Sequence, residues 1–193
     1  MTKVSKFSHD TLMIDVAGTF SETAIFPEQV ADTYLKAGVV SEAGEFLNVA
    51  KKVIRGDASL EEHLPRIVDE FGDIVWYAVM LCSWNDNFQL VDTLGSFEKL
   101  ADSYRGFLEQ TPAPECSDEF FVEVLLEMVL DLIEQVTQDA PSGTMMRTLA
   151  EMGAHLSYFA SEDVGLCESS SRVAAKLQDR MSRQAIKGDG DDR

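Results

Sequence analysis

The sequence is poor in basic residues. Its 193 residues include 16 Lys and Arg against 34 Asp and Glu, so the formal net charge is −18. Because nucleic-acid backbones and anionic membranes are bound by clustered Lys and Arg, this balance argues against polymeric DNA or RNA, and against a membrane, as partners. A small anion remains compatible with the sequence if metal ions and a few local basic residues neutralise it.

Cysteine and long apolar runs are also scarce. Cys82, Cys116 and Cys167 are scattered, and none has the Cys-x-x-Cys or Cys/His spacing of a metal site. They indicate buried or incidental thiols in a reducing compartment. No apolar run reaches about 18 residues, the length that spans a membrane, and none follows Lys3 and Lys6 as in a signal peptide. We therefore expect a soluble, cytoplasmic protein.

Alternating strand patterns are scarce too, whereas helical periodicity covers nearly the whole chain. Apolar residues make up 45 % of the sequence, which is enough for a core. The fold class is therefore all-α. A weak internal echo relates residues 70–77 to residues 151–158, and it reflects either a duplication or chance similarity between helices. The periodicity predicts helices at about 9–24, 29–55, 64–84, 90–110, 117–138, 144–161 and 168–184.

Four acidic residues share a spacing that allows them to meet. Glu42 and Glu45 are three residues apart, as are Glu70 and Asp73 on the next expected helix. Residues at i and i+3 lie on one helix face, so an antiparallel helix pair can bring all four together. Two unit charges about 5 Å apart repel by roughly 3 kcal/mol at an effective dielectric constant of 20, so such a cluster needs cations. Carboxylate ligands favour Mg²⁺, with Mn²⁺ as an alternative.

The surroundings of these acids favour a site over a solvated helix face, which is the alternative in so acidic a chain. Gly44 and Gly72 lie inside the two motifs, although Gly costs about 1 kcal/mol relative to Ala within a helix. Small residues there allow another helix or a ligand to approach closely. Trp76 and Tyr77 follow the second motif, either as core residues or as a surface for stacking a base.

The segments Leu35–Phe46, Lys51–Arg55 and Asp69–Tyr77 together contain Glu-x-x-Glu, a spacer and Glu-x-x-Asp. In this they resemble the MazG-like all-α nucleoside triphosphate pyrophosphohydrolases, a superfamily that includes dimeric dUTPases and dCTP pyrophosphatases. The resemblance covers roughly residues 10–83 and resumes at 176–180 and in the tail. One departure is Val173, because family members commonly carry Asn at that position.

The resemblance implies that Glu42, Glu45, Glu70 and Asp73 bind Mg²⁺. It also implies that a metal-activated water hydrolyses a nucleoside triphosphate to a monophosphate and pyrophosphate, with Glu42 or Glu45 taking the proton. Each candidate phosphate ligand has a structural alternative, at a helix end, on a solvated face or in a terminal tail. These candidates are Lys51, Lys52, Lys176, Arg180, Lys187 and Arg193.

The resemblance further implies a MazG-like helical bundle within a single all-α domain, 1–193. Residues 9–95 would form the catalytic unit, 96–184 additional helices or a degenerate second copy, and 185–193 a Gly/Asp-rich tail. The partner would be a second copy of the chain in a homodimer, or the internal copy in a monomer. In that copy Ala154 replaces Asp73, and Glu127 followed by Leu130 replaces the Glu-x-x-Glu pair. Two other functions remain open: a non-catalytic acidic interaction protein, and a hydrolase of another phosphorylated small molecule.

Overall fold

Four long helices make up most of the described part of the chain. The computed structural model describes residues 30–57, 59–86 and 117–160, with positions 103, 104, 106, 107, 110, 173, 175, 176 and 179. No strand occurs among these residues, which confirms the all-α prediction. The helix expected at 9–24 and the tail expected at 185–193 lie outside the described residues. The described positions within 90–110 and 168–184 are helical. The helices are α2 (Ala31–Arg55), α3 (Leu60–Asp86), α5 (Asp118–Thr137) and α6 (Ser142–Ala160).

Helix α3 begins four residues earlier than the sequence pattern predicts. The backbone N–H of Ser59 donates to Glu62 Oε2 at 2.9 Å, and the Glu62 N–H donates to Ser59 Oγ at 3.3 Å. This reciprocal capping box satisfies two backbone donors at the helix start. Pro65 consequently lies inside the helix instead of opening it. The preceding helix, α2, ends at Arg55, and its C-cap residue Gly56 adopts a left-handed conformation with φ 76°.

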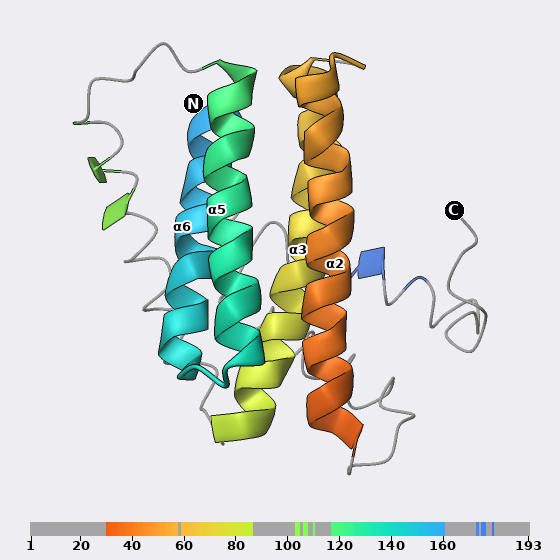
Figure 1. Ribbon diagram of the computed structural model, residues 1–193, viewed down its shortest axis with the longest axis vertical. Helices are drawn as coiled ribbons and strands as arrows, with labels where there is room; N and C mark the ends of the chain where they lie inside the picture. The colour runs from red at the N-terminus through yellow and green to blue at the C-terminus, as the bar shows by residue number, and fades with distance from the viewer. Residues whose placement is uncertain are drawn as a thin grey trace.

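The helices form an antiparallel bundle, with α2 and α6 running in one direction and α3 and α5 in the other (Figure 1). Helix α2 contacts α3 and α5, and α6 contacts α5 and α3. Each helix turns an apolar stripe inward, as shown by the fully buried Leu35, Phe71, Leu125 and Met152. None of the helices in the described part of the chain is long and apolar enough to cross a membrane.

Part of the burial pattern of α2 recurs in α5. An alignment of α5 with α2 on this pattern places Met128 and Asp131 at the positions of Glu42 and Glu45, whereas the sequence comparison places Glu127 and Leu130 there. The series in α2 and in α5 both advance by four, four, three and four residues. They are Leu35, Val39, Ala43, Phe46 and Ala50 in α2, and Phe121, Leu125, Val129, Leu132 and Val136 in α5.

Candidate metal centre

Three glutamates from two helices converge at the middle of the α2–α3 pair. Glu42 and Glu45 on α2 and Glu70 on α3 each offer a carboxylate oxygen, and these oxygens all lie within 4.8 Å of one another. All three side chains are half-buried. Mg²⁺ takes oxygen ligands at about 2.0–2.1 Å, so two ligands on opposite sides of the ion are about 4 Å apart. The donor type and spacing therefore fit a hard divalent cation after small side-chain adjustments.

The electrostatics of Glu42 show how much negative charge is concentrated here. Burial raises the pKa of Glu42 to about 7, and the charges of Asp73, Glu45 and Glu70 act in the same direction. Lys176 offsets part of this effect. A carboxyl group with so high a pKa is one whose ionised form the surroundings do not fully stabilise. A divalent cation reverses such a shift by supplying the missing positive charge.

Asp73, the fourth expected ligand, has a different partner. The Lys176 ammonium donates to Asp73 Oδ2 at 2.7 Å, across 103 residues of sequence. The Asp73 side chain is 16 % exposed and that of Lys176 is 47 % exposed. Asp73 is not part of the set of three converging carboxylates. The structure thus places Lys176 beside the acidic centre, through its contact with Asp73.

A second basic residue at the site, Arg66, is absent from the sequence prediction. Its Nε lies 3.5 Å from Glu70 Oε1, one turn along α3. The Arg66 side chain is about half exposed, so this long ion pair contributes little to stability. The signal for it was present in the sequence, because Arg and Glu four residues apart on a helix are neighbours.

Tyr77 lies next to the acidic residues Glu42 and Asp73. The half-buried Tyr77 lies close enough to Glu42 and Asp73 that their charges contribute to raising its pKa, after burial and a hydrogen bond with Tyr34. The Tyr77 ring rests on Gly38, where an added Cβ would lie 2.2–2.7 Å from ring atoms. Trp76 is 8 % exposed and belongs to the core. A mid-helix Gly one turn before Glu42 was the overlooked sign of this contact.

The remaining predicted residues are less closely associated with the cluster. Lys51 is exposed and Lys52 half-buried on the last two turns of α2. Lys52 acts on Asp57, whose pKa is lowered first by its hydrogen bond with Arg55 and to a lesser degree by Lys52. Gly44 is exposed, and a Cβ added there would have no atom within 4 Å apart from its chain neighbours and the backbone of its own helix. Arg180, Lys187 and Arg193 lie outside the described residues.

The second helix pair also carries acidic residues. The sequence comparison matches Glu70 on α3 with Glu151, which lies on α6. Its pKa is raised by burial, lowered by Arg147 and raised again by Asp131. Met128 is half-buried, and Ala154, which the sequence comparison matches to Asp73, is fully buried. Within the described residues, three acids converge only in the first helix pair.

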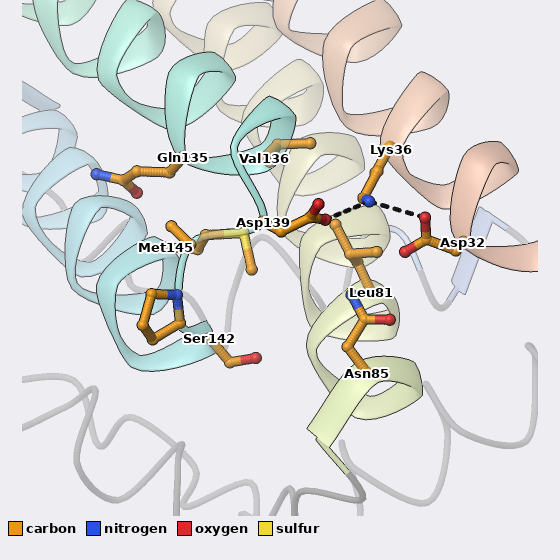
Figure 2. Close-up of a pocket in the computed structure, with 11 residues that line it drawn as sticks. Asp32, Lys36, Leu81, Asn85, Gln135, Val136, Asp139, Ser142 and Met145 are labelled. Carbon is orange, nitrogen blue, oxygen red and sulfur yellow. Dashed lines mark hydrogen bonds and ion pairs between the residues drawn. The ribbon is translucent and has the colours of Figure 1, made fainter.

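A separate cavity of about 590 Å³ lies at one end of the bundle, between the start of α2, the end of α3 and the α5–α6 connection (Figure 2). None of the four predicted metal ligands lines it. Lys36, its basic residue, pairs with Asp32 at 2.7 Å and also with Asp139. Asp139 is a non-glycine residue at φ 55°, a conformation that Asp tolerates. These contacts join α2 to the α5–α6 connection.

In the part of the chain that the structure describes, the fold and site define an all-α bundle with one carboxylate-rich centre. No protein-family model and no solved structure matches the chain. The chain is similar to the Gene 37 protein of Mycobacterium phage L5, with 31 % identity over 88 residues that cover 42 % of this chain and 77 % of that protein. The chain belongs to the same family as this phage protein. The phage protein's name specifies no activity.

Proposed function

We propose that this protein is an Mg²⁺-dependent nucleoside triphosphate diphosphatase, which hydrolyses a (deoxy)nucleoside triphosphate to the monophosphate and pyrophosphate. The observation that carries the proposal is the convergence of Glu42, Glu45 and Glu70 beside the Lys176 ammonium. Carboxylates that can hold a divalent cation, next to a half-exposed ammonium from another segment, match the charge of a polyphosphate. The resemblance to the MazG-like superfamily supports the same reaction.

Different residues of the site would have different roles in such a reaction. Glu42, Glu45 and Glu70 would hold the ion, and Glu42 or Glu45 would accept the proton of the attacking water. When bound, Mg²⁺ supplies positive charge toward the phosphates and lowers the pKa of water. Lys176 lies at the edge of the cluster with half of its side chain exposed, where it can bind phosphate oxygens. Mn²⁺ could replace Mg²⁺ at this site. We expect the protein to act in the cytoplasm.

We also propose that α5–α6 is a degenerate copy of α2–α3 that takes the place of a partner subunit. Support comes from the matching burial steps, from the antiparallel relation of the two pairs, and from the retained Asp131 and Glu151. A monomer of 21.4 kDa is then expected. Light scattering coupled to gel filtration measures the mass, and a stable dimer would contradict the substituted partner.

The test of the activity is a panel of ribo- and deoxyribonucleoside triphosphates incubated with the full chain and Mg²⁺. We expect pyrophosphate, and not single phosphate, to be released from at least one of them. Glu45→Gln should lower the rate by about two orders of magnitude. Glu127→Gln, on the exposed face of α5, is the matched control and should leave the rate unchanged.

Two outcomes would point elsewhere. Release of single phosphate would favour a hydrolase of another phosphorylated small molecule. Absence of any product with the wild-type protein, with Mg²⁺ and with Mn²⁺, would contradict the proposal and favour a non-catalytic interaction protein.

A further inference from the structure

An apolar strip runs along the outer side of the bundle, where α2 and α5 meet. Its members on α2 recur every seven residues, and those on α5 follow at steps of four and three, so each row shares one face of its helix. Four of the six side chains are 38–55 % exposed, and the other two are partly buried. The apolar strip consists of Val40, Leu47 and Ile54 on α2, and of Leu126, Leu130 and Ile133 on α5.

Polar contacts at the two helices show that both rows lie at the α2–α5 seam. Lys36 continues the α2 row by one turn, and it pairs with Asp139, just beyond the end of α5. On α5, Gln135 donates to Thr148 of α6 at 3.0 Å. Leu126 precedes Gln135 by nine residues, or two and a half turns, so it lies on the side of α5 away from α6. Because α2 and α5 lie side by side, the two rows form one surface (Figure 1).

The apolar strip has the length of a helix. Val40 and Ile54 are fourteen residues apart, which is about 21 Å at 1.5 Å per residue. Because α2 and α5 are antiparallel, the row on α5 lies level with the middle of the row on α2. Apolar residues exposed singly need no explanation, but a contiguous strip marks an interaction surface. One amphipathic helix, packed along the groove between α2 and α5, would cover it.

The described positions of two other segments lie elsewhere on the bundle. Lys176 pairs with Asp73 on α3, and Val173 joins the core. Tyr104 lies close enough to Glu151 on α6 for that charge to contribute to raising its pKa, after burial. The segment before α2, in contrast, joins the bundle at one end of the apolar strip, where α2 begins.

Residues 9–24, which lie outside the described residues, have the sequence pattern of a helix that fits this surface. Leu12, Val16 and Phe20 recur every four residues, as on one face of an amphipathic helix. Sixteen helical residues span about 24 Å, close to the length of the apolar strip. Residues 25–29 connect this segment to the start of α2, and a link of this length allows a chain to turn back along the next helix.

The distribution of charge favours the same arrangement. With residues 9–24 antiparallel to α2, residues 1–8 reach the far end of the apolar strip, where α5 begins. These first eight residues contain Lys3 and Lys6 and no acidic residue, in a chain whose net charge is −18. The first turns of α5 carry the exposed acidic residues Glu119 and Glu123. Opposite charges therefore meet at this end of the strip.

We propose that residues 9–24 form an amphipathic helix that packs antiparallel to α2 over the α2–α5 seam, with Leu12, Val16 and Phe20 against the apolar strip. This helix joins the first helix pair to the second, and it covers within one chain a surface that would otherwise attract another protein. The proposal goes beyond the diphosphatase reaction and does not depend on it.

The first test is hydrogen exchange of the full chain, measured by mass spectrometry. Amides of residues 12–20 should exchange at least about a hundredfold more slowly than in an unstructured peptide of the same sequence. Leu130→Gln should reduce this protection by about tenfold or more and leave that of α3 unchanged, because Leu130 is 55 % exposed on the bundle itself. Glu127→Gln, which places the same side chain on α5 outside the apolar strip, is the matched control and should change neither.

Three results of this experiment would overturn the proposal. Residues 12–20 could exchange as fast as the unstructured peptide. Their protection could remain intact in Leu130→Gln, which would place the helix away from the apolar strip. Finally, protection that grows with protein concentration, together with a dimer in light scattering that Leu130→Gln dissociates, would assign the strip to a second copy of the chain.

The second test changes the segment and leaves the four-helix bundle untouched. Val16→Gln should reduce the protection of residues 12–20 as Leu130→Gln does, whereas Ser21→Gln, outside the apolar face, should not. The double variant Val16→Gln with Leu130→Gln should lose about tenfold and not about a hundredfold, because both substitutions disrupt the same contact. Losses that multiply in the double variant would show that the two side chains act separately, and would overturn the proposal.

Discussion

Replacing Glu42 by Gln removes one negative charge from the acidic centre without changing the shape of the side chain. In metal-free protein at pH 8 the Glu42 carboxylate faces those of Glu45 and Glu70, with oxygens within 4.8 Å. Each such pair repels by roughly 3 kcal/mol at an effective dielectric constant of 20. The side chains are only half-buried, and the substitution also removes attraction to Lys176, so the net gain is smaller.

We therefore expect Glu42→Gln to raise the free energy of unfolding by about 1–2 kcal/mol in the presence of EDTA at pH 8. For a chain of this size each kcal/mol corresponds to about 2–4 °C, so the Tm should rise by about 2–8 °C. The assay is thermal unfolding followed by circular dichroism. Glu127→Gln, exposed on α5, is the control, with an expected change within about 0.5 kcal/mol.

The pH dependence makes the prediction sharper. The folded state raises the pKa of Glu42 from 4.5 to about 7, so between these values it binds more protons than the unfolded state. The stability of the metal-free protein attributable to Glu42 consequently falls as the pH rises through this window, and stays low above it. The gain from Glu42→Gln should be close to zero near pH 4.5 and complete at pH 8.

Mg²⁺ provides the final comparison. A ligand that binds only the folded state raises its stability, so Mg²⁺ should raise the Tm of the wild type more than that of Glu42→Gln. A lower Tm for Glu42→Gln in EDTA at pH 8 would refute the electrostatic reasoning. An equal gain at both pH values would refute it too, because the effect would then not follow the ionisation of Glu42.

Four further substitutions test the packing and the caps. Gly38→Ala should lower the free energy of unfolding in urea by about 1–3 kcal/mol, because its Cβ would meet the Tyr77 ring. Gly44→Ala, whose Cβ would meet no neighbour, should raise it by up to about 1 kcal/mol. Equal effects of the two substitutions would refute this contrast. Burial lowers the pKa of His155 to about 4, so the unfolded state binds more protons below the ordinary value of 6.5 and stability is lost as the pH falls. His155→Leu should therefore be more favourable at pH 5 than at pH 8 by about 2 kcal/mol in urea unfolding at both values, and pH-independent behaviour would contradict it. Ser59→Ala should remove the capping hydrogen bonds, lower the free energy of unfolding by about 1 kcal/mol and so lower the Tm. An unchanged Tm would show that the capping box does not stabilise the protein.

Helix positions were largely predictable because amphipathic periodicity is local. The ranges expected for α2, α5 and α6 agree with the structure to within two residues at each end. The start of α3, predicted at about 64, lies at Leu60, because Ser59 and Glu62 form a capping box ahead of Pro65. Proline is tolerated here inside the second turn, since the helix is held by burial of residues such as Ile67 and Phe71.

The spacing of Glu42, Glu45 and Glu70 was enough to predict that these residues share a centre, because i and i+3 positions face the same way and the intervening chain permits an antiparallel return. The sequence by itself thus determined the helices, the acidic pairs and the overall charge. It also determined the resemblance that motivates the proposed reaction.

Only the tertiary structure decided which side chains meet across the chain. The three glutamates converge, while Asp73 pairs with Lys176 from 103 positions away. The Tyr77 ring settles on Gly38, and Asp131 lies close enough to Glu151 for its charge to raise the pKa of Glu151. The physical reason is that helical spacing sets the direction of a side chain relative to its own helix, whereas its partner depends on how the helices rotate and slide to bury their apolar stripes.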